Sequence, residues 1–278
     1  MPAADAVETG PVTGPVTGPV TRVRFRGGGF QPRPLRHAGW MGFAVVLLAW
    51  QAAVGSGFVD PVFLPSPLDA GRALLDLTLS GELFRDLAVS MARLAGGWVL
   101  GTIAGLLVGG AMGMFSLARS VTLPLISALF PIPKIALLPL LILWFGIGEP
   151  SKIATIALGV FFPTAIATFT GIDAVPRNLI RMAQSFDLPA SHIVWKVIVP
   201  GALPGILAGM RISTSIALLL LVAAEMIGAD TGIGVLVLTA GNLMQTDKLM
   251  AGVAVLSLLG LVIGAAVSAC ERQLLRWR

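Results

Sequence analysis

Six apolar stretches, each about as long as a membrane-spanning helix, constrain this sequence more than any other feature. They cover residues 39–59, 87–114, 121–146, 152–172, 203–227 and 249–270. A helix needs about 20 mainly apolar residues to cross the hydrocarbon core of a bilayer. Charged residues make up 12% of the chain, whereas soluble domains have about 25%. The sequence therefore predicts an all-α integral membrane protein with six transmembrane helices.

Two of these stretches are irregular. The first is interrupted by Gln51 and by a pair of glycines at positions 55 and 57. The third contains Pro124, Pro131, Pro133 and Pro139. Proline removes a backbone donor and clashes with the preceding helical turn, so we expect kinks or a partly unwound segment in the third span.

The first 38 residues differ in composition from the rest of the chain. Residues 10–21 repeat Gly-Pro-Val-Thr three times and are followed by five arginines. Such low-complexity sequence cannot form a packed core. We predict a disordered basic cytoplasmic arm over residues 1–38 and a transmembrane domain over residues 39–278.

The distribution of basic residues predicts the orientation. With the N-terminus inside, thirteen of the nineteen Lys and Arg residues fall on the inside: Arg22, Arg24, Arg26, Arg33, Arg36, Arg119, Arg177, Arg181, Lys196, Arg211, Arg272, Arg276 and Arg278. This bias follows the positive-inside rule. We therefore expect an inner (plasma) membrane protein with both termini in the cytoplasm. Because the basic residues lie at the ends of apolar runs and not on one face, they indicate no nucleic-acid partner despite the net charge of +5.

Glycines recur every fourth residue in the second stretch, at Gly101, Gly105, Gly109 and Gly113. This spacing puts them on one helical face, where a second helix can approach closely. The pattern predicts a tight helix–helix contact, which could be either static or sliding.

Two segments outside the spans have helical periodicity. The stretch around 67–79 is amphipathic and is expected to lie along the outer membrane surface. The inside loop, about 173–202, predicts short helices over 177–186 and 190–198, with Asp187 capping the second helix. Such a helix pair suits either a stiff lever moved by a soluble partner or an ordinary interfacial helix.

The loop 173–202 resembles the coupling segment of permeases in the ATP-binding-cassette importer family. The family pattern is Glu-Ala-Ala, three residues, Gly, nine residues, an aliphatic residue, any residue, an aliphatic residue and Pro. The corresponding positions here are Arg181, Met182, Ala183, Asp187, Val197, Val199 and Pro200. The sequence departs from the pattern at Arg181, Met182 and Asp187; the last replaces a Gly that permits a left-handed turn, which Asp tolerates less well.

Further segments resemble one subfamily, the permeases for nitrate, sulfonates and taurine. These are residues 131–152, 161–163, 171–173, 223–228 and 232–234. The resemblance implies a type I ABC importer permease-like core that forms the path of a small solute, such as a sulfonate, nitrate or taurine. It also implies three kinds of partner: ATP-binding-cassette ATPase subunits, an extracytoplasmic substrate-binding protein and a second permease copy, as a homodimer.

Two ionisable residues lie in apolar surroundings. Lys134 is in the third stretch and Glu225 is near the end of the fifth. Charges inside a membrane are costly, so they mark either a translocation path or a structural pair. Lys134 could attract an anionic solute or could extend to the interface, and Glu225 could line the path or form a structural hydrogen bond.

No catalytic, cofactor or metal site is indicated. The chain has no Gly-x-x-x-x-Gly-Lys-Ser/Thr phosphate loop, so a partner subunit is expected to bind and hydrolyse ATP. The single Cys270 and the isolated His37 and His192 form no metal-binding pattern. The main alternative is an ion-coupled secondary transporter, which predicts carboxylates inside several spans. A membrane-embedded enzyme would need convergent polar groups, which the pattern lacks.

Overall fold

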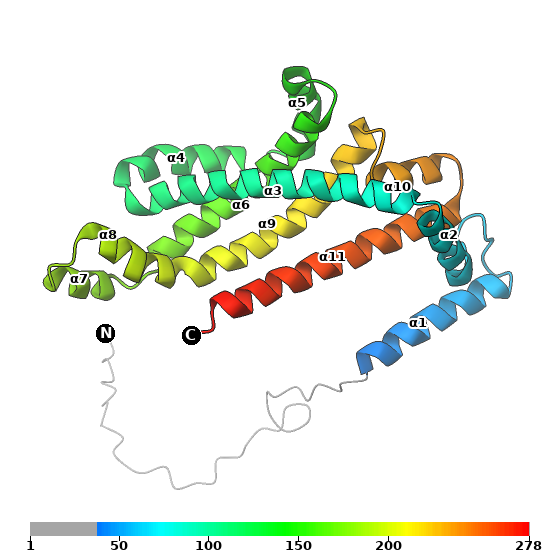
Figure 1. Cartoon of the computed structure of the whole chain (residues 1–278), viewed down its shortest axis with the longest axis horizontal. Coiled ribbons are helices and arrows are strands. Elements are labelled where there is room, and N and C mark those ends of the chain that lie inside the picture. Colours follow the sequence, from blue (N-terminus) through cyan, green and yellow to red (C-terminus); the bar gives the residue numbers. More distant parts are fainter. Residues whose placement is uncertain (1–37, 278) are drawn as a thin grey trace, which may run out of the picture. The chain divides into compact units, whose positions relative to one another are not determined.

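The computed structural model describes residues 38–277, and all the regular structure within them is helical (Figure 1). The elements are α1 (Ala38–Gly55), α2 (Pro67–Leu79), α3 (Glu82–Met114), α4 (Ser116–Leu129), the 3-10 helix η1 (Lys134–Leu137), α5 (Leu138–Phe145), α6 (Glu149–Asp173), α7 (Arg177–Ser185), α8 (Ala190–Ile193), the π-helical turn η2 (Val194–Ile198), α9 (Val199–Gly228), α10 (Ile233–Asn242) and α11 (Thr246–Leu274). The predicted N-terminal arm lies, up to residue 37, outside the described residues. The chain divides into two units, Met1–Val46 and Leu47–Arg278. Of the first unit, only the beginning of α1 is described.

All six apolar stretches form helices, but not six uninterrupted spans. Within the described residues four helices are long and apolar enough to cross a membrane: α3, α6, the continuous helix Ala190–Gly228 and α11. A fifth span results if α4 and α5 are counted together, although a bend of 91° separates them. The first stretch forms α1, which ends at Gly55, where the sequence turns to glycine and polar residues. The prolines of the third stretch therefore break it more sharply than a kink.

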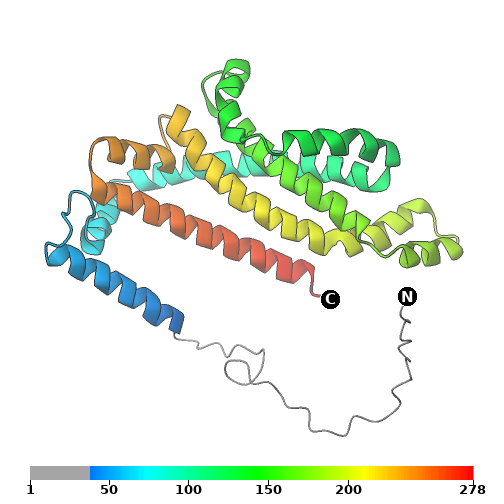
Figure 2. The same cartoon turned by 180° about the vertical axis from the view of Figure 1, so that it is seen from behind.

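A bundle of α3, α6 and α9 forms the centre of the second unit, and these helices run side by side in Figures 1 and 2. The glycine face of α3 packs directly on α6. A Cβ added at Gly105 would lie 2.7 Å from Thr164 Cβ, and one added at Gly113 would lie 2.7 Å from Ile172 Cγ2. The predicted close helix contact is confirmed, since no side chain larger than hydrogen fits on this face.

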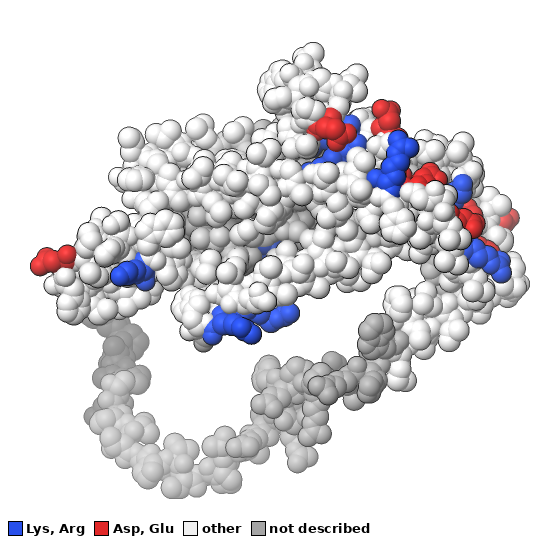
Figure 3. All heavy atoms as spheres, viewed as in Figure 1, with Lys and Arg blue, Asp and Glu red and all other residues white. Residues whose placement is uncertain are grey.

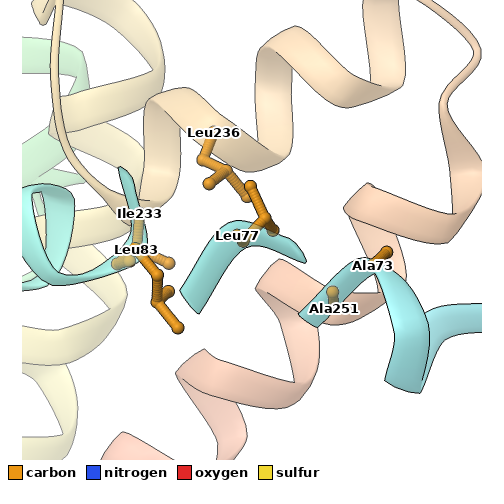
Figure 4. Packing of buried hydrophobic residues seen from close by; sticks show 6 residues of the cluster. All are labelled: Ala73, Leu77, Leu83, Ile233, Leu236 and Ala251. Carbon is orange, nitrogen blue, oxygen red and sulfur yellow. The ribbon is translucent and has the colours of Figure 1, made fainter. Parts of the chain in front are cut away.

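The predicted amphipathic helix is also present as α2. Its Ala73 and Leu77 are buried in a hydrophobic cluster with Ile233 and Leu236 of α10 and Ala251 of α11 (Figure 4). Burial of this apolar face stabilises the packing of α2 against the two C-terminal helices.

Charged side chains gather near the ends of the helices. On the face drawn in Figure 3, they lie beside α5, over the α2 and α10 end, over α7 and α8, and near the C-terminus of α11, and much of the remaining surface is uncharged. Exposed side chains within the long helices α3, α9 and α11 include Leu107, Ile212, Leu219, Leu258 and Leu261. An uncharged belt with charged ends is the surface that a bilayer requires.

Candidate functional site

The connection between α6 and α9, which with the first two residues of α9 we call the coupling segment (residues 174–200), folds as two short helices. α7 corresponds to the predicted helix 177–186, and α8 with η2 corresponds to the predicted helix 190–198. The second helix is not separate, because it continues without a break into α9. Figures 1 and 2 show α7 and α8 beyond the ends of α6 and α9. A movement of this segment would therefore be passed directly to the long helix α9.

The turn between the two helices is built around Asp187, but not as predicted. The N-cap of α8 is Pro189, with no side-chain hydrogen bond, so the expected capping role of Asp187 is wrong. Instead Asp187 has φ 49°, and its N–H donates to the Gln184 carbonyl at 3.0 Å while Leu188 N–H donates to the Ala183 carbonyl at 3.3 Å. This pair of bonds is the Schellman motif that ends many helices. Asp187 thus adopts the left-handed conformation for which the family pattern has glycine.

The motif residues differ in exposure. Ala183 is buried, and Val197, Val199 and Pro200 are partly buried. Arg181, Met182 and Asp187, the three departures from the pattern, are all exposed. Four further large apolar side chains of the segment are exposed: Leu179, Phe186, Leu188 and Trp195.

At the opposite end of the bundle a buried ion-pair cluster joins three helices. It consists of Arg93 of α3, Glu149 of α6 and Glu225 of α9. Arg93 Nε and Nη2 each donate to Glu149 at 2.6 Å, and Arg93 Nη1 donates to Glu225 Oε1 at 2.8 Å. The side chains of Arg93 and Glu225 are 2% and 0% exposed, whereas that of Glu149 is 53% exposed. Glu149 is therefore the only member of the three whose side chain is open to solvent.

The carboxylate of Glu225 also fixes the start of α10. Gly234 N–H donates to Glu225 Oε2 at 2.9 Å, Ile233 N–H to Ser90 Oγ at 3.0 Å and Gly232 N–H to Asp86 Oδ1 at 3.1 Å. The first N–H groups of a helix have no partner within the helix. Side chains of α3 and α9 supply these acceptors, and the negative charge suits the positive end of the helix dipole.

Lys134, the other predicted path residue, is far less open to a solute than expected. Its ammonium donates to the carbonyls of Leu129 and Phe130, each at 2.9 Å, and of Ile132 at 2.7 Å. An ammonium has three donors, and all three are used. No ion pair or hydrogen bond joins it to Glu225 among residues 38–277. A path role for either residue stays a prediction.

Sequence reasoning missed Arg93, Glu149, Asp86 and Ser90. A detectable signal was Arg93, a charge inside an apolar stretch, which needs a partner. The partners could not be identified, because Glu149 and Glu225 are 56 and 132 residues away. No group of three His, Cys, Asp or Glu side chains able to hold a metal ion occurs in the described part of the chain.

Comparison with known proteins identifies a family and several relatives. The family described as binding-protein-dependent transport system inner membrane component matches residues 101–276. SsuC of Bacillus subtilis (strain 168), a permease protein named for aliphatic sulfonates transport, is 40% identical over 235 residues, which are 84% of this chain and 85% of SsuC. The taurine transport system permease protein TauC of Escherichia coli (strain K12) is 36% identical over 239 residues, 84% of this chain and 87% of TauC.

Solved structures share the fold. A chain from the inward facing MetNI methionine ABC transporter superposes with a TM-score of 0.59 at 23% identity, covering 69% of this chain and 95% of that chain. A chain from an amino acid ABC transporter with histidines gives a TM-score of 0.56 at 15% identity, covering 74% and 98%. The predicted fold class, an all-α permease core of the ABC importer type, is confirmed.

Proposed function

We propose that two copies of this chain form the path of an ATP-driven importer for small sulfonates. The chain belongs to the family of binding-protein-dependent transport system inner membrane components. The chain is a membrane-spanning permease subunit of an ATP-driven importer. The proposal adds the pairing of two copies, the class of solute, the orientation and the residues that couple the permease to its motor.

The coupling segment carries this proposal. It combines a motif that resembles the ATPase-contacting loop of importer permeases with exposed apolar side chains, of which Phe186 is 72% and Trp195 71% exposed. Large exposed apolar side chains at the end of a helical bundle indicate a protein partner or a membrane. The same segment bears Arg177, Arg181 and Lys196, which favour the cytoplasmic side. A cytoplasmic ATPase subunit suits this surface best.

Force applied to the coupling segment would move α9. α8, η2 and α9 form one continuous helix, and α9 packs along α6, which in turn contacts the glycine face of α3. Closure of two ATPase subunits on ATP would therefore turn these three helices as a body. The ion-pair cluster would lie at the extracytoplasmic end, where the binding protein delivers solute.

The solute class rests on the relatives. SsuC is named for aliphatic sulfonates and TauC for taurine, which is itself an aminosulfonate. We assign the same class to this chain, with most of the selection made by the binding protein. The ion-coupled alternative is less well supported, because the carboxylate of Glu225 is held by Arg93, Ser90 and the Gly234 N–H and is not open to an ion.

Uptake by proteoliposomes tests the proposal. The permease, its ATPase subunit and its binding protein are reconstituted together, and entry of labelled taurine and ethanesulfonate is measured with and without ATP. We expect uptake only when all three components and ATP are present, and little uptake of carboxylates of similar size. Equal uptake of the matching carboxylates would contradict the solute class. Uptake driven by an ion gradient without the ATPase would contradict the importer mechanism.

A further inference from the structure

The break between α4 and α5, residues 130–133, is the one strongly bent point within the apolar segments of the described chain. We call it the elbow. It contains Pro131 and Pro133, neither of which has an N–H to donate. In a continuing helix the N–H of residue 133 would reach the carbonyl of Leu129. The elbow therefore leaves carbonyl oxygens without their usual helical donors, and the Leu129 carbonyl instead accepts a longer backbone bond from Ile132 N–H at 3.3 Å.

Lys134 supplies those donors. Its ammonium is within 2.9 Å of the carbonyls of Leu129, Phe130 and Ile132, so one side chain bonds to the end of α4 and to the elbow itself. It also lies over two aromatic rings, 4.3 Å from the centroid of Phe162 and 5.9 Å from that of Phe130. Cation–π contacts of this kind strengthen when water is excluded. Lys134 thus joins the elbow to α6.

The contact with Phe162 gives the depth of the elbow. α6 spans Glu149–Asp173, so Phe162 lies 13 residues after its start and 11 before its end. The elbow is consequently level with the middle of a spanning helix. Non-helical backbone is tolerated at that depth only where it is covered by protein or lines a water-filled cavity. Pro131, Ile132 and Pro133 are nevertheless exposed in this chain.

We propose that the elbow forms the mid-membrane wall of the solute path, and that Lys134 is a positioning residue that fixes the elbow and does not bind the solute. This inference rests on the proposed function. The path at this level then presents proline and isoleucine side chains to the solute. The ammonium of Lys134 bonds to backbone carbonyls behind them. Selection of the sulfonate group would accordingly not take place at Lys134.

Thiol labelling tests the position of the elbow. Cys270 is the only cysteine, so a Cys270→Ser background permits single additions at Ile132 and at Leu258. Leu258 on α11 is more exposed in this chain, 62% against 38% for Ile132, and is expected to face lipid. In the complex with its ATPase, cycled with ATP, a charged methanethiosulfonate reagent should modify Ile132→Cys at least tenfold faster than Leu258→Cys. Equally slow modification, as expected if a second copy covers the elbow permanently, would overturn the proposal.

Substitution of Lys134 tests its role. Spin labels at Ser120 of α4 and Leu143 of α5, both exposed, report the distance across the elbow. In Lys134→Met this distance distribution should broaden, and the maximal uptake rate should fall at least tenfold. The fall should be the same for zwitterionic taurine and for anionic ethanesulfonate. An unchanged distance together with a raised KM for ethanesulfonate alone would show a solute-binding lysine and overturn the proposal.

The two measurements separate this proposal from the proposed function. Thiol labelling and spin-label distances need an assembled complex but no uptake, so they remain decisive if the solute class is wrong. If Lys134→Met does not assemble, the Ile132→Cys and Leu258→Cys pair, which keep Lys134, still decide whether the elbow lines the solute path.

Discussion

Arg93 and Glu225 are 132 residues apart in sequence, yet their side chains form a 2.8 Å ion pair in the interior of the bundle. Together with Glu149 they join the N-terminal parts of α3 and α6 to the C-terminal part of α9. A buried pair of this kind contributes little net stability, but loss of one partner leaves the other charge buried and uncompensated.

The ion-pair cluster should respond unequally to the loss of each member. Arg93→Met leaves Glu225 buried without its counter-ion, and we expect a loss of about 3–5 kcal/mol in the free energy of unfolding. Glu149→Gln should have a much smaller effect, because Glu149 is 53% exposed. Thermal unfolding of the purified permease in detergent checks this order. Equal shifts in Tm for the two variants would contradict the assigned burial.

The glycine face of α3 should not accept a methyl group. In Gly105→Ala the new Cβ would lie 2.7 Å from Thr164 Cβ and 2.9 Å from the Phe161 carbonyl oxygen, so α3 and α6 must separate. Overpacking of this kind costs about 1–3 kcal/mol. Gly110→Ala is the matched control on the same helix, since its nearest neighbour would be Met114 Cε at 3.9 Å. The Tm should fall for Gly105→Ala and not for Gly110→Ala.

The Asp187 turn should tolerate glycine and reject a β-branched residue. Asp187→Gly keeps both Schellman hydrogen bonds and removes the cost of a left-handed conformation, about 1–2 kcal/mol for a residue with a Cβ. Asp187→Val raises that cost. We expect binding-protein-stimulated ATP hydrolysis to persist in Asp187→Gly and to fall severalfold in Asp187→Val. Equal activities would mean that the turn conformation does not affect coupling.

Ala183 should be sensitive to size and charge. It is buried in the coupling segment, so the larger, charged side chain of Ala183→Glu must displace the residues packed around it. We expect transport to fall at least tenfold while the permease remains folded. The neighbouring Gln184 is exposed, and Gln184→Glu adds the same charge without displacing a helix. Normal uptake in Ala183→Glu would argue against this segment as the point of force transfer.

Several features of the fold could be predicted because they depend on neighbouring residues. The spacing of Gly101 and Gly105 along one helix was enough to predict the close packing of α3. The prolines at 131 and 133 predicted a disturbed third span. Such local patterns determine backbone geometry directly, so no knowledge of distant contacts was needed.

Other features could not be predicted because they depend on distant partners. Arg93 signalled a need for counter-charge, but the sequence offers no means of choosing Glu149 and Glu225 among the acidic residues. α10 is only ten residues long, too short for a span, and its start is fixed by side chains of α3 and α9. For Asp187, helix capping is the less costly use of the residue, yet the backbone adopts the left-handed turn.

Sided labelling of Ser191 decides whether a cytoplasmic motor can reach the coupling segment. Ser191 is an exposed residue of α8 in that segment, and Ser191→Cys in the Cys270→Ser background gives a single reactive thiol. We predict that a membrane-impermeant maleimide reaches this thiol only from the cytoplasmic side, and that bound ATPase subunits slow the reaction. Labelling from the extracytoplasmic side of sealed vesicles would contradict force transfer through α8 to α9, because a cytoplasmic ATPase could not then contact the coupling segment.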